Sequence, residues 1–508
     1  MSDESARAAL RSTAKLVVVE APAGCGKTYQ GAEYARDIAS LGEQRGRPLI
    51  VTHTHAACSV FAERTTGARS RVSIRTIDSV VTEIASAYHV GLGLPADVVA
   101  WVRRRGEGGH AELCMRVAKL LSVRPMIAAT IARRHPIVIC DEHQDSSGDQ
   151  HAVIMALHRA GAQLRVFADP MQRIFRQRPV NGGFPPYDWN GFTGGGVHEL
   201  LEQPHRWRGG SSELGAWMLK AREALKNRGR LDLRSGRIPE AVSVVYADNQ
   251  ANRHLAFALM SVERQPVDAF ARGQQSLLVL TRSNETAASL RAFFNRRIPI
   301  WEGHVREGLD DLVAAVGAAA ADPESLATAV VEFMARVGKG FSPSAFGRAF
   351  VDEASNGCTK RRTGKPALIQ ELARFIVDDP SHRGVANMLK RMWEFRQHEP
   401  AFGAVEIDNR NEFWDAIRLG EFETPELGLA EITSRRSYSR PRPPSRAIST
   451  IHKAKGIECE AVIVMPCDSR AFPARDDARC LLYVAISRAT RNLLLVVSRD
   501  DPSPLIDM

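Results

Sequence analysis

A glycine-rich octapeptide near the N-terminus constrains the fold more than any other feature of the chain. It directly follows the apolar run Leu16–Val19 and consists of Ala21, Pro22, Ala23, Gly24, Cys25, Gly26, Lys27 and Thr28. Gly24 and Gly26 let backbone N–H groups close around phosphate oxygens at the start of a helix. Lys27 can reach the β- and γ-phosphates, and the Thr28 hydroxyl can bind Mg²⁺. A strand, this loop and a following helix predict a nucleotide-binding α/β lobe.

The octapeptide departs from the strict phosphate-loop pattern at Ala21, where a glycine is usual. The alternative is a chance glycine-rich turn between a strand and a helix. We favour the phosphate loop because a lysine, a hydroxyl and a preceding strand coincide. Cys25 beside Lys27 suggests a reactive thiol, but we expect it to fill a position that needs a small residue.

Two adjacent acids follow a second apolar run, Ile137–Ile139, in the sequence Asp141-Glu142-His143-Gln144-Asp145. Open α/β sheets bind their ligands at the carboxyl ends of strands. We therefore expect Asp141 to hold Mg²⁺ through water and Glu142 to orient and deprotonate the attacking water. An acidic strand end alone is usually a turn or a helix cap, and the phosphate loop upstream favours catalysis. His143 has no histidine or cysteine at ligand spacing, so we interpret it as structural.

Apolar runs rich in β-branched residues predict buried parallel strands at both ends of the chain. The further runs are 49–51, 164–167, 242–245, 277–280, 462–464 and 493–497. The middle segment instead has helical periodicity, in 324–337, 365–377, 385–397 and 411–420. The predicted fold is α/β, with two parallel-sheet lobes and an α-helical domain inserted in the second lobe.

The expected domain boundaries follow from this alternation. They are 1–205 for the first, ATP-binding lobe with a short accessory insert at about 82–132, 206–300 for the first part of the second lobe, 301–444 for the helical insert and a basic linker, and 445–508 for the rest of the second lobe. The prolines and charges of 434–444 predict an exposed linker rather than a packed helix.

Charge and cysteine usage limit the class of protein. The formal net charge of +10 over 508 residues favours polyanionic partners such as nucleic acid, although a solvated basic face has the same composition. The eight cysteines form no CxxC pair, which predicts reduced thiols and a cytoplasmic protein. No leader and no membrane-spanning run are evident, so no membrane partner is expected.

The acid pair and several later segments also resemble a known family. Asp141 to Asp145 resemble the DExQD box of UvrD/Rep-type superfamily 1 DNA helicases, and further boxes of that family follow in order. They are 51–57 (motif Ia), 76–79 (Ib), 168–175 (III), 204–206 (IV), 280–284 with 298–299 (IVa), 450–458 (V) and 482–489 (VI). Gln144-Asp145 and Lys455-Gly456 favour the UvrD side of the superfamily. The resemblance covers both α/β lobes and implies that they are RecA-like.

The resemblance implies roles at an ATP–Mg²⁺ site between the lobes. Arg206 and Arg488 match arginines that approach the γ-phosphate, where a guanidinium contributes roughly 10³–10⁵ in rate. Gln172 matches the residue that senses the γ-phosphate and couples it to DNA. Glu458 matches a residue near the ribose, and Gly456 allows close backbone approach.

The resemblance also implies 3′→5′ movement on single-stranded DNA, or on DNA with a single-stranded end. Hydroxyls and cations hold phosphates and flat side chains stack on bases in such grooves. The matching positions are Thr52, His53, Thr54, Thr76, Asp78, Phe175, Arg178, Arg282 and His452.

Three departures from the family bear on function. No glutamine before the phosphate loop resembles the adenine-reading Q motif, and Gln177 stands where the family has a base-stacking tryptophan. The stretch between Thr76 and Asp141 and the helical insert are both shorter than usual. We expect no nuclease domain after Arg488. A short UvrD-like chain of this kind resembles the helicase-like subunit of Gabija antiphage systems, which works with a separate OLD-type nuclease.

Three functions are compatible with these features. The leading one is an ATP-dependent DNA helicase or translocase in DNA repair, recombination or antiphage defence. The alternative is a DNA-dependent ATPase that regulates a partner nuclease and unwinds little by itself. A non-enzymatic DNA scaffold is least favoured, because Lys27, Glu142 and Arg488 are all present.

Overall fold

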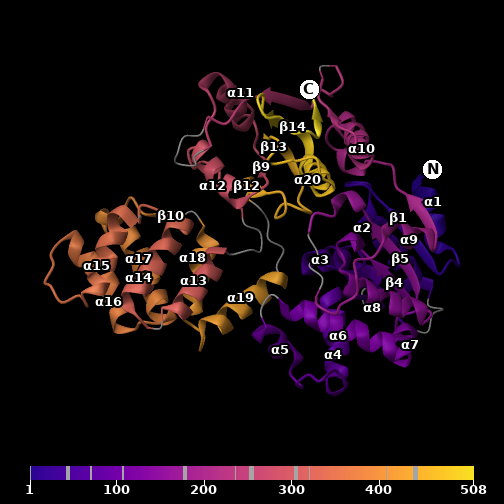
Figure 1. Ribbon diagram of the computed structural model, residues 1–508, viewed down its shortest axis with the longest axis horizontal. Coiled ribbons are helices and arrows are strands. Elements are labelled where there is room, and N and C mark those ends of the chain that lie inside the picture. The colour runs from indigo at the N-terminus through magenta and orange to yellow at the C-terminus, as the bar shows by residue number, and fades with distance from the viewer. Residues whose placement is uncertain are drawn as a thin grey trace. The chain divides into compact units, whose positions relative to one another are not determined.

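The structure is a computed structural model. It describes residues 2–41, 46–68, 71–105, 108–175, 180–234, 236–250, 257–301, 307–319, 321–341, 343–407, 409–438 and 444–508. The chain divides into two compact units (Figure 1). Unit 1 comprises Met1–Ile298 and Arg442–Met508, and unit 2 comprises Pro299–Pro441.

The first sheet of unit 1 contains six strands. They are β1 (Leu16–Glu20), β2 (Leu49–Thr52), β3 (Ser73–Thr76), β4 (Ile137–Cys140), β5 (Gln163–Ala168) and β6 (Val197–Leu200). Their order is β3-β2-β4-β5-β1-β6, and every neighbouring pair is parallel. All carboxyl ends therefore lie along one edge, where the loops after β1, β2, β3, β4 and β5 meet.

Helices cover both faces of this sheet, which explains why its inner strands are apolar on both sides. They are α1 (Ser2–Arg11), α2 (Lys27–Leu41), α3 (His55–Arg64), α4 (Ile77–Ala87), α5 (Val98–Arg104), α6 (Gly109–Val123), α7 (Pro125–Arg134) and α8 (Gly148–Arg159). Leu16 and Val18 of β1 pack in one cluster with residues of α4, α6 and α8. Val17 and Val19 alternate to the other face and pack with residues of α1 and α2.

The second sheet of unit 1 contains β8 (Val242–Tyr246), β9 (Leu277–Thr281), β12 (Arg446–Thr450), β13 (Cys459–Cys467) and β14 (Ala489–Val497). Their order is β12-β9-β13-β14-β8, and all pairs are parallel. Chain segments before and after unit 2 thus share one sheet, coloured magenta to pink and yellow in Figure 1. The short strands β7 (Leu231–Asp232) and β15 (Ile506–Asp507) form a separate parallel pair.

Helix α9 (Trp189–Gly194) contacts β6 of the first sheet. The helices around the second sheet and its approach are α10 (Ser212–Lys226), α11 (Ser261–Arg272), α12 (Asn284–Phe293) and α20 (Asp476–Ile486). Helix α10 packs against α20. Two parallel sheets with helical layers confirm the predicted α/β fold class of RecA-like lobes.

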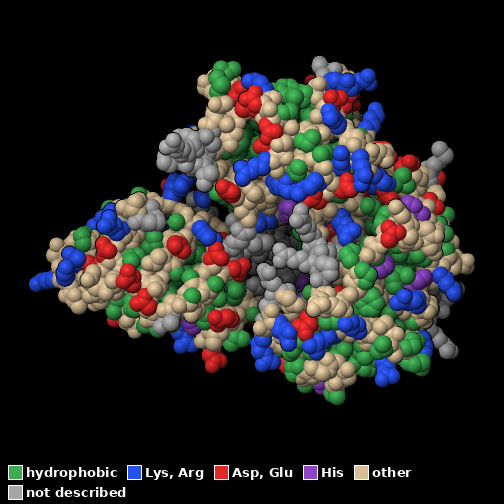
Figure 2. Space-filling model, in the orientation of Figure 1, with side chains coloured by type: hydrophobic (Ala, Val, Ile, Leu, Met, Phe, Trp, Pro, Cys, Tyr) green, Lys and Arg blue, Asp and Glu red, His purple; other side chains and the backbone are tan. Residues whose placement is uncertain are grey.

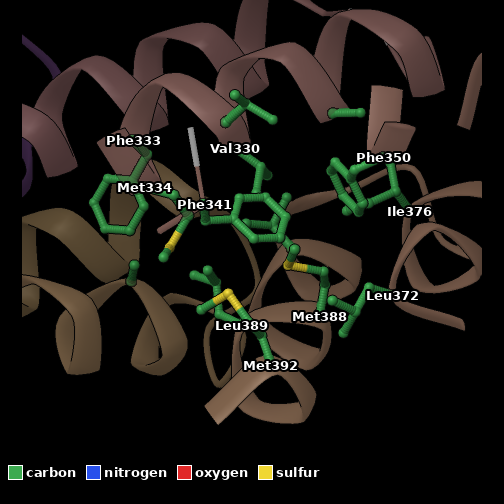
Figure 3. Packing of buried hydrophobic residues seen from close by; sticks show 14 of the residues in the cluster. Val330, Phe333, Met334, Phe341, Phe350, Leu372, Ile376, Met388, Leu389 and Met392 are labelled. Carbon is green, nitrogen blue, oxygen red and sulfur yellow. The ribbon is translucent and has the colours of Figure 1, made fainter. Parts of the chain in front are cut away.

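Unit 2 is helical and has a core of its own. Its helices are α13 (Glu307–Ala318), α14 (Pro323–Val337), α15 (Arg348–Ser355), α16 (Lys365–Asp378), α17 (His382–His398), α18 (Arg410–Leu419) and α19 (Pro425–Tyr438). The strands β10 (Gly338–Lys339) and β11 (Glu406–Ile407) pair antiparallel. Figure 3 shows Phe341 among Val330, Met388 and Leu389, all of which are buried in one cluster.

One local prediction is wrong. We expected a non-helical linker from Ser434, but α19 continues to Tyr438. The helix-breaking prolines begin only at Pro441, so the charges before them do not prevent a helical turn. Gln177 and Arg178 lie outside the described residues. Among the helices of the described ranges, none combines the length and apolar composition needed to cross a bilayer.

Candidate nucleotide site and nucleic-acid interface

The phosphate loop connects β1 to α2, and its glycines are required by its geometry. Gly24 and Gly26 have φ values of 73° and 89°, in the left-handed region that favours glycine. The N–H of Arg206 donates to the Gly24 carbonyl at 3.1 Å. A Cβ atom on Gly24 would lie 2.6 Å from the Cβ of Arg206. The loop therefore closes against the segment that carries the predicted motif IV arginine.

Lys27 and Glu142 form an ion pair at the carboxyl edge of the first sheet. Lys27 Nζ lies 3.0 Å from Glu142 Oε1. Burial alone would lower the pKa of Lys27, but Glu142 and Asp169 raise it above its ordinary value. Burial would likewise raise the pKa of Glu142, but Lys27 and Lys455 lower it. Both groups are therefore charged at neutral pH, as a phosphate ligand and a water-activating carboxylate require.

The backbone of Glu142 is held in an uncommon conformation. Its φ and ψ are 53° and 39°, in the left-handed region, which costs a non-glycine residue about 1–3 kcal/mol. Such strained residues cluster at functional sites, and in this conformation the Glu142 carboxylate pairs with Lys27.

Asp141 is 4% exposed, and its Oδ1 atom has no hydrogen-bond partner among the described residues. Burial and the neighbouring Glu142 raise the pKa of this carboxyl above its usual range. A hard divalent cation prefers oxygen ligands and would compensate this buried charge. Thr28 lies in the first turn of α2, directly after Lys27. Asp141 and Thr28 therefore fit the oxygen donors that Mg²⁺ takes.

Gln144 connects the acid pair to the loop after β5. Its side-chain N–H₂ donates to Glu142 Oε2, and its Oε1 accepts from the N–H of Asp169 at 3.0 Å. Asp169 Oδ2 in turn accepts from Gln172 Nε2 at 2.9 Å. The proposed γ-phosphate sensor, Gln172, is thus joined through two side chains to the proposed catalytic base.

The segment between β13 and β14 of the second sheet contributes Tyr483 and Arg488, and the turn after β6 of the first sheet contributes Arg206. The hydroxyl of Tyr483, on α20, accepts from the phosphate-loop N–H of Ala23 at 2.8 Å. Arg206 pairs with Glu458 at 2.8 Å and donates to the Ser487 carbonyl at 2.6 Å. The predicted residues Arg206 and Glu458 therefore lie together, and the backbone of Arg206 contacts the phosphate loop.

Arg488 is 1% exposed and donates to neutral oxygens: the Val484 carbonyl at 3.0 Å and the Ser487 hydroxyl at 2.9 Å. Burial and then the nearby charge of Arg206 lower the pKa of Arg488 to about 10. A buried guanidinium whose printed hydrogen bonds go to neutral oxygens, close to the charge of Arg206, makes this region electrostatically suited to a polyphosphate.

Lys455 joins the two sheets from the segment after β12. Its Nζ lies 2.6 and 2.8 Å from the two carboxylate oxygens of Asp145 and donates to the Gln172 carbonyl at 2.7 Å. It also lies 5.2 Å from the centre of the Phe175 ring. Phe175 is 47% exposed, and its ring centre is 6.1 Å from that of His452. The predicted DNA contacts Phe175 and His452 therefore lie side by side next to this bridge.

The predicted DNA contacts after β2 and β3 lie at helix starts. Thr54 caps α3 by accepting from the N–H of Ala57 at 3.1 Å, and Thr76 caps α4 by accepting from the N–H of Ser79 at 3.1 Å. Parallel pairing of β2 and β3 places both helix N-termini along the same edge. N-termini carry positive potential that favours phosphate.

The other predicted contacts are engaged within the protein. Thr52 Oγ1 donates to the Thr54 carbonyl at 3.0 Å, and Asp78 Oδ1 accepts from Gln150 at 3.2 Å. Arg282 donates to the carbonyls of residues 470 and 471 at 2.9 and 2.8 Å. Figure 2 shows Lys and Arg side chains in a band across the part of unit 1 that holds the second sheet.

A histidine contact near the acid pair has no signature in the sequence. His143 Nε2 lies 3.0 Å from His151 Nδ1, and the Ser146 hydroxyl lies 3.2 Å from both His143 and His53. Burial lowers the pKa of His143 well below its ordinary value, so this group stays neutral. Because His53 contacts Ser146, it faces the loop after β4. Within the described ranges, no group of His, Cys, Asp and Glu is arranged to hold a metal ion.

Family models match a segment in each of the two lobes. Residues 5–178 match the family model of an AAA domain, and residues 446–496 match the UvrD-like helicase C-terminal domain. The first match contains the phosphate loop and the acid pair, and the second contains Lys455 and Arg488. A search of curated proteins finds no match to the chain.

Proposed function

This chain belongs to the UvrD/Rep type of superfamily 1 helicases, and from that membership we propose that it is an ATP-driven motor that moves 3′→5′ on single-stranded DNA. One observation carries the proposal: Lys27 and Glu142 pair at 3.0 Å at the phosphate loop, which Arg206 contacts from the turn after β6 and Tyr483 contacts from α20 of the second lobe. Nucleotide binding at that loop would couple the spacing of the lobes to hydrolysis.

Each residue has a distinct role in this proposal. Lys27 and the N–H groups of the phosphate loop hold the β- and γ-phosphates. Asp141 and Thr28 hold Mg²⁺, which supplies charge neutralisation on the phosphate oxygens when bound. Glu142 orients the attacking water and takes its proton, while Arg206 and Arg488 stabilise the charge that develops on the γ-phosphate.

The decisive experiment compares two substitutions in the full chain. Lys27→Ala should weaken ATP binding, because it removes the phosphate ligand. Glu142→Gln should keep ATP binding and lose turnover, because the phosphate cradle stays complete. Binding is measured with a fluorescent ATP analogue, and hydrolysis is measured with and without single-stranded DNA. Hydrolysis by Glu142→Gln at the parental rate would refute the assignment of the base.

DNA binding is tested by its salt dependence. Each phosphate that the protein neutralises should contribute a slope of about −0.7 to log affinity against log salt for a single strand. The net charge of +10 and the helix N-termini of α3 and α4 favour several such contacts. An affinity for oligo-dT that does not change with salt would exclude this groove.

A second function stays open because Gln177 replaces a base-stacking tryptophan. Loss of an aromatic side chain whose stacking contributes roughly 1–3 kcal/mol per base would weaken DNA binding more than it slows ATP hydrolysis. In that case the chain is an ATPase that regulates a partner nuclease. Strong DNA-stimulated hydrolysis with poor unwinding by the isolated chain would favour this second function.

A further inference from the structure

A buried arginine outside every helicase motif contacts the nucleotide site. Arg222 lies on α10 and is 3% exposed. Its Nε and Nη2 atoms donate to Asp169 Oδ1 at 3.1 and 2.8 Å, and Nη2 also donates to Glu20 Oε1 at 2.6 Å. Glu20 is the last residue of β1, directly before the phosphate loop, and Asp169 directly follows β5.

Asp169 connects Arg222 to the proposed catalytic groups through hydrogen bonds. Its Oδ2 accepts from Gln172 Nε2 at 2.9 Å, and Oδ1 also accepts from the N–H of Met171 at 3.1 Å. The N–H of Asp169 donates to Gln144, whose amide donates to Glu142. One guanidinium therefore fixes a carboxylate on which both the proposed sensor and the proposed base depend.

The charges of this network are matched. Burial alone would lower the pKa of Arg222, but Asp169 and then Tyr483 raise it. Burial would raise the pKa of Glu20, but hydrogen bonds from His198, Lys226 and Arg222 lower it below its usual range. Arg222 and Glu20 are therefore ionised despite their burial.

A contribution to folding stability does not explain well why buried charged residues are present here. A buried ion pair costs about as much in desolvation as it gains in attraction, and well-packed apolar residues often serve as well. What a guanidinium adds is fixed geometry, since its planar fork sets the positions of two carboxylates at once. That geometry lies where the loops of β1 and β5 enter the nucleotide site.

Resting on the proposed ATPase function, we propose that Arg222 is a positioning residue for ATP hydrolysis, which holds Asp169 so that Gln172 and Glu142 keep their catalytic orientation. Arg222 does not touch the nucleotide in this role. Helix α10 also packs against α20, the helix that carries Tyr483. Arg222 therefore links the packing of the second lobe to the sensor and the base of the first.

The chain offers a matched control on the same helix. Lys226 follows Arg222 by one turn and lies 2.6 Å from the same Glu20 oxygen, but no contact with Asp169 is present among its described interactions. Lys226→Met removes a cation from Glu20 only. Arg222→Met removes the cation from Glu20 and Asp169 together.

The experiment measures kcat, KM for Mg²⁺–ATP and thermal unfolding of the full chain with saturating oligo-dT. Arg222→Met should lower kcat by about 10- to 100-fold, the usual effect of removing a group that orients a catalytic ligand, while KM changes little. Arg222→Lys should recover part of kcat, because it keeps the charge but not the fork. Lys226→Met should keep the parental kcat.

The outcomes separate the two proposals. Hydrolysis by the parental chain with unchanged kcat in both Arg222 variants would overturn the role of Arg222. A rise in KM in step with the loss of kcat, or an equal loss in Lys226→Met, would make Arg222 a structural support only. If Arg222→Met does not fold, Arg222→Lys decides on the same criteria. A parental chain without DNA-stimulated hydrolysis would overturn the proposed function, and this inference with it.

Discussion

Gly24 is constrained by its own backbone and by a distant residue. Its φ of 73° disfavours any side chain, and a Cβ atom there would lie 2.6 Å from Arg206 Cβ and 2.9 Å from the Trp207 ring. Real Cβ contacts are not that short, so the loop or the Arg206 segment would have to move. The shape of the phosphate loop therefore depends on the segment that brings Arg206 to the site.

Gly24→Ala should weaken ATP binding by more than about tenfold, because a left-handed backbone costs roughly 1–2 kcal/mol before the overlap is added. Gly236→Ala is the control, since Gly236 has a similar φ of 79° but a Cβ atom there would have no described atom within 4 Å. Equilibrium ATP binding and thermal unfolding of both variants are compared. Parental ATP affinity in Gly24→Ala would contradict the close packing of Arg206 on the loop.

Residues of the site differ in how far the sequence predicts them. Lys27, Asp141 and Glu142 lie in short contiguous motifs directly after apolar runs, so the local sequence predicts them, and Lys27 and Glu142 do lie together. Arg222 and Tyr483 meet the site across 202 and 460 residues of chain, as their bonds to Glu20 and Ala23 show. No local pattern marks Arg222, because an arginine on a helix usually lies in solvent.

Strands with both faces covered were the easiest elements to predict. β1, β4 and β9 are buried throughout and read as continuous apolar runs. β3 and β6 escaped prediction because they are the edges of the first sheet and are partly exposed. An edge strand needs apolar residues on fewer positions, so its sequence carries a weaker signal.

The segment after β12 is a second element whose role depends on tertiary contact. Lys455 reaches Asp145 and the Gln172 carbonyl, whereas Lys453, two residues earlier, donates to Asn284 at 2.9 Å. Asn284 belongs to the second lobe, and Asp145 follows the acid pair of the first. The contacts of Lys455 therefore join the two lobes, whereas the Lys453–Asn284 hydrogen bond lies within the second lobe.

Lys455→Ala should lower the stimulation of ATP hydrolysis by DNA more than it lowers ATP binding, because it removes the ion pair between the lobes and leaves the phosphate loop intact. A loss of roughly 10-fold is expected from the effect of displacing a positioning group. Lys453→Ala should behave as the parental chain. The measurement is the ratio of hydrolysis rates with and without oligo-dT, and equal ratios in all three proteins would show that the pair does not transmit the signal.

At the scale of the whole molecule, the two units have separate cores. The unit 2 cluster contains buried residues from α13 to α19, and the clusters around the first sheet contain residues of unit 1 only. The chain leaves unit 1 after Ile298 and returns before Arg446, and both residues line the same small cavity of unit 1. The two connection points are therefore neighbours, and a short linker can join them.

Replacing 299–441 by about eight Gly and Ser residues, which span roughly 15 Å, should leave unit 1 folded and able to bind ATP. Every predicted ATP-site residue, from Ala21 to Arg488, lies within unit 1. The shortened chain should keep parental ATP affinity and lose its affinity when Lys27→Ala is added, which controls for nonspecific binding. Unit 2 expressed alone should unfold cooperatively as a helical protein, because its core is self-contained. Loss of ATP binding in the shortened, folded chain would mean that unit 2 organises the nucleotide site.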